Sequence, residues 1–527
     1  MKENKNTKQN LQSISEIKTV RIIPLLILLA CLIVLILIPL KIISYGYLPS
    51  DDALRHSGFS TVDKTWNDVL VSDYAIPDMH IGWHQTLKYI HKTTNATADE
   101  LVTFSVVLLF LLWVIPSLFM LKRPESWIFA LLLAYWLAGL NMRLFLGRPG
   151  IFHGAVLVWM LLLADRLNEK KNNWGIYFFL TFTTALSIYW RTTWFMYALP
   201  VLAFVLARRW RATVRLLGIL TVAMGLATLA TGPTLMINSL VLSFKVMGSA
   251  EYVTQLVGEL QPMTSFMSIL LTLSLFSIWI HLRGDQLRRF FDTPSFYLLI
   301  ISAFLGVSAI KWWLDFGVPS FVVLICLEMD SSLSETPFFT RVLSPISLRR
   351  LGIVLATCTM LFLCFTVDER GRWTAALHNE EIDITDKNVQ PGLPEDGGII
   401  YNDSMGTFFQ TFFNHPDQNW HYILGFEAAL MPKEDLQIFR NIQWNSGALK
   451  AYDPWIQKMT KKDRLWIAQG LGAPHPRIKS LEWTRLTSFL WSGRLPQTNS
   501  IQKQLIKKNS PPSHNTSIKN TPYTQWK

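Results

Sequence analysis

The sequence predicts an all-α polytopic membrane domain of about eleven transmembrane helices, followed by a small extracytoplasmic α/β domain. Three observations predict it. Half of the 527 residues are hydrophobic and only 16% are charged, whereas about a quarter of the residues in a soluble domain are charged. The hydrophobic residues fall in continuous blocks, which is typical of helices that cross a bilayer. Basic residues recur in alternate loops between these blocks, as the positive-inside rule requires of cytoplasmic loops.

The apolar blocks define the predicted spans. The first block, Ile22–Ile43, follows a lysine-rich polar tail. Because it is longer than the apolar core of a signal peptide, we predict an uncleaved signal anchor whose tail lies in the cytoplasm. Several later blocks are shorter than the roughly 20 residues of a full span. The later spans are predicted at Leu101–Leu121, Trp127–Phe145, Ile151–Ala164, Trp174–Trp190, Trp194–Ala207, Leu216–Leu235, Met263–Leu282, Ser295–Ile310, Gly317–Leu327 and Leu351–Val367.

The loops between the blocks give the orientation. An odd number of crossings from a cytoplasmic start places the C-terminus outside, and each loop expected in the cytoplasm carries basic residues. We therefore predict a multi-pass protein of the inner (plasma) membrane, with a cytoplasmic N-terminus and an extracytoplasmic C-terminus. The predicted organisation is a cytoplasmic tail over residues 1–21, a transmembrane domain over 22–367 with a first external loop at 44–100, an extracytoplasmic domain over 368–495 and a disordered tail over 496–527.

Two segments indicate that the C-terminal domain mixes helices and strands. Residues Gly397–Gly406 alternate as a strand does and end in turn-forming residues. Residues Pro432–Arg440 open with proline and acidic side chains, which is typical of the start of a helix.

The charge and the cysteines exclude other classes of protein. The net charge of +12 does not predict nucleic-acid binding, because the basic residues lie in the terminal segments and short loops rather than on one soluble face. The four cysteines fall within apolar blocks. The sequence therefore predicts neither a disulfide in a soluble domain nor a metal site with CxxC spacing.

Four cations lie at helix ends that are expected on the outer side, against the usual bias. Arg143 and Arg148 close the third predicted span, Arg191 closes the fifth and Lys311 closes the ninth. Cations there are costly unless they face water or an anion, and several neighbouring spans are short enough to leave an aqueous cavity in the outer leaflet. The four together predict a phosphate or pyrophosphate site. The alternative is that each cation extends to the lipid headgroups.

A pair of adjacent carboxylates follows the first span. Asp51 and Asp52 emerge at the membrane surface, with Arg55 and His56 one helical turn further on. A carboxylate beside a bilayer and a second carboxylate can have a raised pKa, which suits a general base. The pair also offers the oxygen ligands that Mg²⁺ or Mn²⁺ prefers. The alternative is a helix N-cap at Ser50 or Asp51.

Two histidines lie farther along the same loop. His80 and His84 are four residues apart and would share one face of a helix, which predicts a possible metal pair. The alternative is a pair of unligated histidines near the headgroups. Glu259, Gln261 and Asp315 are also expected on the outer side, where they are further candidates for the site.

These residues together resemble the GT-C superfamily of polytopic glycosyltransferases, which includes lipid A aminoarabinose transferases and protein O-mannosyltransferases. The stretch Tyr47-Leu-Pro-Ser-Asp51-Asp52-Ala-Leu-Arg55 is similar to the Asp-Glu-Ala-Arg stretch of the aminoarabinose-transferase-like branch. By this resemblance, Asp51 matches the catalytic carboxylate and Asp52 its acidic neighbour. The match departs in Asp for Glu and in an arginine displaced by one residue, so the division of roles between Asp51 and Asp52 stays open.

The resemblance implies transfer of a sugar from a polyprenyl-phosphate donor to an extracytoplasmic glycan, lipid or protein acceptor. Asp51 would take a proton from the acceptor hydroxyl, and Arg148, Arg191 and Lys311 would hold the donor phosphate, with Arg55, Arg143 and Asp315 as further substrate-binding candidates. Membrane lipid is the other expected partner. The alternatives are a polymerase or ligase of lipid-linked polysaccharide, a transporter or flippase, and a non-catalytic scaffold. A transporter would show two related halves and broken helices near the membrane midplane, and the sequence shows neither.

Overall fold

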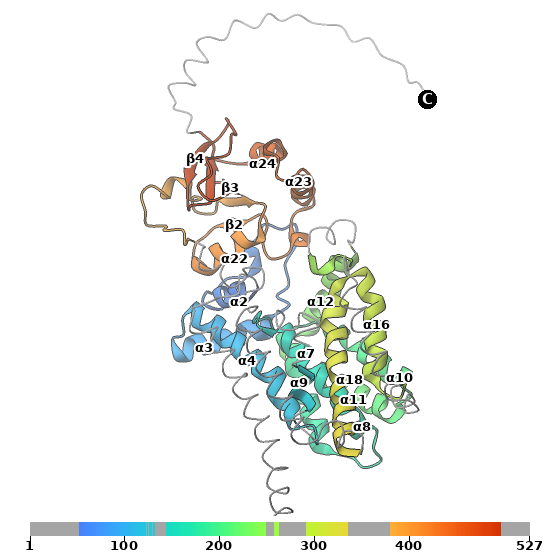
Figure 1. Ribbon diagram of the computed structural model, residues 1–527. Coiled ribbons are helices and arrows are strands. Elements are labelled where there is room, and N and C mark those ends of the chain that lie inside the picture. The colour runs from blue at the N-terminus through green and yellow to red at the C-terminus, as the bar shows by residue number, and fades with distance from the viewer. Residues whose placement is uncertain are drawn as a thin grey trace, which may run out of the picture.

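The computed structural model describes residues 52–122, 124, 126–128, 130–131, 144–248, 258–262, 291–335 and 380–496. These residues form a bundle of mostly apolar helices and a small domain with a β-sheet. Figure 1 shows the sheet domain, in orange and red, at one end of the bundle, and α8 at the opposite end.

Three helices among the described residues are long and apolar enough to cross a membrane. They are α4 (Ala98–Leu118), α11 (Trp210–Thr231) and a continuous helix over Ile310–Ser331. The last is the greater part of a run made of α17 (Ile310–Trp312), the π-helical turn η5 (Trp313–Gly317) and α18 (Val318–Glu335). The other helices of the bundle are α7 (Gly150–Leu162), α8 (Ala164–Asn168), α9 (Trp174–Trp190), η2 (Trp194–Tyr197), α10 (Ala198–Leu206), α12 (Pro233–Gly248), η3 (Gly258–Leu260) and α16 (Pro294–Ser308).

Most predicted spans that fall on described residues coincide with a helix to within a few residues. The predicted span Leu216–Leu235 is an exception: α11 ends at Thr231, and α12 begins two residues later. The break has a local cause, because Gly232 has a φ of +86° and Pro233 is suited to the first position of a helix. α12 therefore occupies residues that we expected in an external loop. The predicted spans Ile22–Ile43, Met263–Leu282, Leu351–Val367 and most of Trp127–Phe145 lie outside the described residues.

The segment that the sequence predicts as the first external loop is largely helical over the residues that the structure describes, 52–100. It contains α2 (Asp52–Ser60), η1 (Trp66–Asp68) and α3 (Ile81–Thr94), and α2 packs against α3, α4 and the C-terminal domain. Gly82 lets α3 approach the end of α9, because a Cβ at this position would collide with the carbonyl oxygen of Tyr189. Thr192, just after α9, donates its backbone N–H to Met79 at 3.0 Å. These contacts fix the loop to the bundle.

The C-terminal domain is built on a five-stranded sheet with the order β2-β1-β3-β5-β4. β1 pairs in parallel with β2 and β3, while β5 is antiparallel to β3 and β4. The predicted strand and helix are present as β1 and α23. The elements are η7 (Gln390–Gly392), β1 (Ile399–Asn402), α22 (Met405–Asn414), β2 (His421–Tyr422), η8 (Ala428–Leu430), α23 (Lys433–Trp444), η9 (Leu449–Tyr452), α24 (Asp453–Lys458), β3 (Arg464–Ala468), β4 (Glu482–Arg485) and β5 (Leu490–Arg494).

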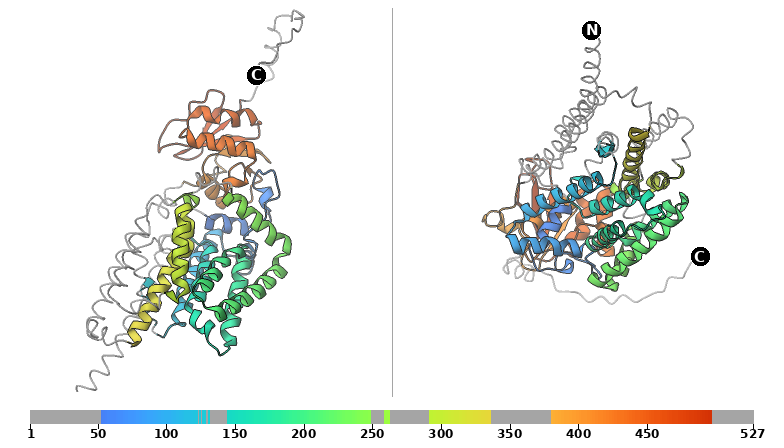
Figure 2. Two further views of the ribbon diagram at one scale, coloured as in Figure 1. Left: turned by 90° about the vertical axis from the view of Figure 1, so that its right-hand side faces the viewer. Right: turned by 90° about the horizontal axis from the view of Figure 1, so that it is seen from below.

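The first external loop extends this sheet. The Val71 N–H donates to the Tyr422 carbonyl at 3.0 Å, and the Tyr422 N–H donates to the Val69 carbonyl at 2.8 Å. These bonds place Leu70 beside the outer strand β2 as a parallel bridge. The loop and the C-terminal domain thus meet at the same end of the bundle, as Figure 2 (left) also shows. The segment after β2 is thereby held over α2.

Candidate functional site

A chain of ion pairs joins four separate parts of the sequence at this end of the bundle. It begins at Asp52, the first described residue of α2. Asp52 Oδ1 accepts from Arg55 Nε at 2.8 Å, and its Oδ2 lies 3.3 Å from Arg148 Nε, just before α7. Arg148 Nη1 donates to Glu259 Oε1 of η3 at 2.8 Å. Asp52 and Glu259 are therefore connected through one guanidinium.

The ion pairs continue into the helix that starts at Ile310. Lys311 Nζ donates to Glu259 Oε2 at 2.9 Å and lies 3.6 Å from Asp315 Oδ2, one turn further along. We call Asp52, Arg55, Arg148, Glu259, Lys311 and Asp315 the charge network. Lys311 lies in the first turn of this helix, rather than closing the preceding span as the sequence suggested, because α16 already ends at Ser308.

The charge network is partly open to solvent. The side chains of Asp52, Arg148, Glu259, Lys311 and Asp315 are 21–27% exposed. The Arg55 side chain is only 4% exposed, and its guanidinium lies 4.0 Å from the ring centre of Phe426 in the C-terminal domain. The network is therefore in contact with solvent, while Arg55 is enclosed against the C-terminal domain.

The electrostatics of Asp52 favour a permanent charge. Burial alone would raise its pKa, but Arg55 and Arg148 outweigh this and hold the pKa of the carboxyl well below its usual range. A carboxylate with such a low pKa is a weak proton acceptor at neutral pH. Asp52 is thus better suited to orienting the two arginines than to removing a proton. Asp51 lies outside the described residues.

Glu427 adds a second kind of carboxyl to the site. It precedes η8 in the C-terminal domain and is close enough to Asp52, Lys311 and Glu259 for electrostatic interaction. Its Oε1 is buried and has no hydrogen-bond partner among the described residues. Burial, reinforced by Asp52, raises the pKa of Glu427 to about 7. A carboxyl in this range can both accept and release a proton at neutral pH.

We did not predict Glu427 as a site residue, because it lies far along the chain from the other members of the site. It lies 375 positions after Asp52 in a domain whose placement over α2 depends on tertiary contacts. The signal that could have drawn attention to it is the run Gly425-Phe426-Glu427-Ala428-Ala429, an acidic residue inside an otherwise apolar stretch of a soluble domain.

A second series of hydrogen-bonded polar side chains lies next to the charge network. The Asp78 Oδ2 lies 2.7 Å from His84 Nδ1, and His84 Nε2 lies 2.7 Å from His56 Nδ1. Burial, together with Arg55 and His80, lowers the pKa of His56 well below its usual value. His56 is therefore neutral at physiological pH. This series ties the middle of α2 to the start of α3 and so supports the position of Asp52 one turn away.

The predicted histidine pair has a different setting from the one expected. His80 precedes α3 as its N-cap, and its ring centre lies 6.3 Å from that of His84. Both ring nitrogens of His84 have protein partners. Within the described part of the chain, no group of three His, Cys, Asp or Glu side chains is arranged to hold a metal ion. Metal binding by His80 and His84 stays a prediction.

Arg191 lies beside the network. It follows α9 directly, and its guanidinium lies against Gly150 at the start of α7, two residues after Arg148. It is also close enough to His80 for electrostatic interaction. The structure thus brings Asp52, Arg55, Arg148, Lys311 and Asp315 together, with Arg191 next to them. Arg143 lies outside the described residues.

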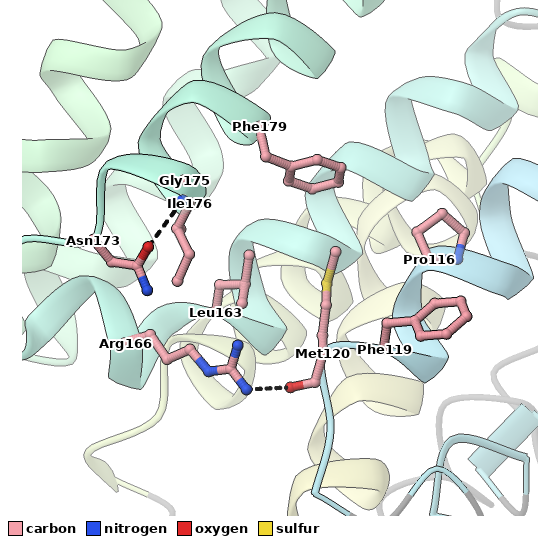
Figure 3. A pocket seen from close by; sticks show the side chains of 9 residues that line it. All are labelled: Pro116, Phe119, Met120, Leu163, Arg166, Asn173, Gly175, Ile176 and Phe179. Carbon is pink, nitrogen blue, oxygen red and sulfur yellow. Dashed lines mark hydrogen bonds between the residues drawn. The ribbon is translucent and has the colours of Figure 1, made fainter.

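The described residues also line a groove of about 370 Å³ elsewhere in the bundle. Figure 3 shows this groove between the end of α4, α8 and the start of α9. Arg166 donates to the Met120 carbonyl at 3.1 Å across it. α7 separates the groove from Arg148, so it is not part of the charge network. Its lining is otherwise mostly apolar: Pro116, Phe119, Met120, Leu163, Asn173, Gly175, Ile176 and Phe179.

Neither the comparison with protein-family models nor the search of curated proteins finds a match to this chain. The assignment of a function therefore rests on the chain's own residues and their arrangement.

Proposed function

We propose that this chain is a membrane glycosyltransferase that moves a sugar from a polyprenyl-phosphate donor to an extracytoplasmic acceptor. The observation that carries the proposal is the meeting of Asp52, Arg148 and Lys311 in one partly open charge network. Charged residues at the end of apolar helices are costly unless they serve a ligand or one another. A phosphate on a lipid carrier matches both the cations and the apolar surroundings.

The proposed topology places the network on the outer side. The chain would cross the inner membrane about eleven times, with a cytoplasmic N-terminus, and would carry its C-terminal domain outside. The lipid tail of the donor would lie along the bundle in the membrane. The acceptor, a glycan, lipid or protein, would approach from the side of the C-terminal domain.

In the proposed transfer, the cations stabilise the leaving phosphate and a carboxylate accepts the proton. The acceptor hydroxyl oxygen attacks the anomeric carbon, the bond from that carbon to the phosphate oxygen breaks, and the polyprenyl phosphate leaves. Arg148, Arg191 and Lys311 would stabilise the charge that grows on the leaving phosphate. The hydroxyl proton would go to a carboxylate of the Asp51–Asp52 pair. Because Asp52 is held by two arginines, we assign the proton to Asp51.

The proposed transfer is written without a divalent metal. The described carboxylates of the network face arginine and lysine, so the placed residues offer no set of oxygen ligands for Mg²⁺ or Mn²⁺. We therefore derive no step through a metal, and a metal held by the Asp51–Asp52 pair stays a prediction.

The carboxylate assignment is tested by Asp51→Asn. Membranes containing this variant should not transfer sugar from a polyprenyl-phosphate donor, because the amide cannot accept the hydroxyl proton. Asp63→Asn is the matched control, since Asp63 lies in the same loop but its side chain is 83% exposed. Transfer at the wild-type rate by the Asp51→Asn protein would remove Asp51 from the mechanism.

The phosphate assignment is tested separately by Arg191→Ala. This variant should bind undecaprenyl phosphate more weakly in a titration of the purified protein in detergent. The expected loss is roughly tenfold, in keeping with one charge-assisted contact. Unchanged affinity would contradict a phosphate-binding role for Arg191.

A further inference from the structure

The two cations at the centre of the charge network are already bridged by an anion of the chain itself. Glu259 divides its carboxylate between them, with Oε1 at 2.8 Å from Arg148 Nη1 and Oε2 at 2.9 Å from Lys311 Nζ. Two oxygens of one phosphate can make the same pair of contacts, since carboxylates and phosphates are bound by the same donors. The Glu259 carboxylate therefore occupies the position that a donor phosphate would take.

Each of these cations also has a second carboxylate partner. Asp52 Oδ2 lies 3.3 Å from Arg148 Nε, and Asp315 Oδ2 lies 3.6 Å from Lys311 Nζ. Both partners belong to helical elements of the bundle end. They would continue to orient Arg148 and Lys311 if Glu259 moved away, so the cations do not depend on Glu259 for their positions.

The Glu259 side chain is suited to exchange. It is the most exposed member of the network at 27%. Its backbone turn is held by other contacts: the Ile310 N–H donates to the Gln261 carbonyl at 2.9 Å, and Leu260 packs against Ala429. Rotation of the side chain would break its ion pairs with Arg148 and Lys311 without moving the backbone. Partly exposed ion pairs are worth about 0–1 kcal/mol each, so a phosphate group that contacts both cations through two of its oxygens can displace the carboxylate.

We propose that Glu259 is a resident competitor of the donor phosphate: its carboxylate fills the anion site between Arg148 and Lys311 until a phosphomonoester or phosphodiester displaces it. The inference rests on the proposed function, because it takes the same two cations as the phosphate-binding groups. It predicts that substitution of Glu259 and substitution of Arg148 or Lys311 change phosphate affinity in opposite directions. Removing the charge of Glu259 strengthens phosphate binding, whereas removing either cation weakens it.

The experiment compares ligand affinities of the purified full-length protein in detergent at low ionic strength. The ligands are undecaprenyl phosphate, inorganic phosphate and undecaprenol, which lacks the phosphate. We expect Glu259→Gln to bind undecaprenyl phosphate about 5- to 10-fold more tightly than the wild type, and Arg148→Ala to bind it about 10-fold more weakly. Undecaprenol affinity should change in neither variant.

Two controls separate the outcomes. Arg209→Ala removes an arginine of similar exposure, 24%, whose partner Asp165 lies in α8, and it should not change affinity for any of the ligands. Glu259→Asp keeps the charge but is too short to bridge both cations, so it should bind undecaprenyl phosphate more tightly than the wild type, by a smaller factor. This variant carries the test if Glu259→Gln does not fold.

The ligands locate the effect. A gain in affinity for inorganic phosphate as well as for the lipid locates the effect at the phosphate group. A gain in affinity for the lipid alone would contradict direct competition.

The competitor role of Glu259 and the phosphate site itself would be contradicted by different results. If the wild type binds undecaprenyl phosphate but the Glu259 variants bind it equally or more weakly, Glu259 supports the cations and the competitor role is wrong. If neither the wild type nor any variant distinguishes undecaprenyl phosphate from undecaprenol, the phosphate site itself is wrong, and the proposed function fails with it.

Discussion

At the scale of single residues, the site holds two carboxyl groups whose surroundings push their pKa values in opposite directions. Asp52 faces two arginines and stays ionised, whereas Glu427, whose Oε1 is buried, lies near other carboxylates and has a pKa of about 7. Such divergence is typical of sites in which one carboxylate provides fixed charge and another exchanges protons. We therefore expect substitutions at the two positions to differ in their pH dependence.

Asp52→Asn should destabilise the protein and abolish transfer. The amide leaves Arg55, which is 4% exposed, without its carboxylate partner, and loss of one member of a largely buried pair costs about 1–3 kcal/mol here, after allowing for the partial exposure of Asp52. Because the pKa of Asp52 is lowered in the folded protein, this stabilisation is present above pH about 4 and lost in stronger acid. Thermal unfolding at neutral pH measures the effect. A midpoint equal to that of Asp63→Asn would contradict it.

Glu427→Gln should flatten the pH dependence of stability. The pKa of Glu427 is raised from 4.5 to about 7, so the folded protein binds this proton more tightly than the unfolded chain does. Stability is therefore lost as the pH rises from about 5 to 8, by up to about 3 kcal/mol. The unfolding midpoint of the wild type should fall across this window by more than that of the variant. Parallel curves would show that Glu427 does not titrate there.

At the scale of elements, the approach of α3 to α9 depends on one glycine. A side chain at Gly82 would collide with the Tyr189 backbone, whereas a Cβ at Gly218, in the middle of α11, meets nothing within 4 Å. Gly82→Ala should lower stability by about 2 kcal/mol or more, while Gly218→Ala should be neutral or stabilising by up to about 1 kcal/mol. Equal unfolding midpoints for the two variants would contradict the close packing of α3 on α9.

Apolar blocks predicted the helices well where a continuous run of apolar residues serves both burial in the bundle and membrane crossing. The block Trp174–Trp190 coincides with α9, because its ends are marked by polar residues. The pattern did not predict the separate helices α11 and α12, since both sides of Gly232 are equally apolar. It also did not predict the π-helical turn at Trp313–Gly317, in which the Trp313 ring packs against Gly317.

At the scale of the whole molecule, the C-terminal domain faces away from the cytoplasm in the proposed topology. In a variant without native cysteines, Leu471→Cys should react with a membrane-impermeant maleimide on intact cells, because Leu471 is 83% exposed in that domain. Lys171→Cys, in an exposed loop before α9, should react only after the membrane is opened. The reverse pattern would contradict the orientation that the loop charges predict.

Some residues of the candidate site could be predicted from the sequence, and others could not. Cations next to the ends of apolar blocks and an acidic stretch after the first block drew attention to Asp52, Arg148 and Lys311, because charged side chains beside a bilayer are costly unless they face water or a partner. Glu427 could not be predicted in the same way. Its position depends on how the first external loop joins the edge strand β2, which is a tertiary contact without a local pattern.

The most direct measurement is the release of polyprenyl phosphate from a polyprenyl-phosphate sugar by the purified protein in the presence of cell-envelope extract. The wild type and Arg209→Ala should release it at equal rates, while Arg148→Ala should be slower by at least about tenfold, since it lacks a cation beside the leaving phosphate. Release that requires the protein but is the same in all three proteins would contradict the charge network as the site of transfer. No release by the wild type above the extract alone would contradict the glycosyltransferase itself.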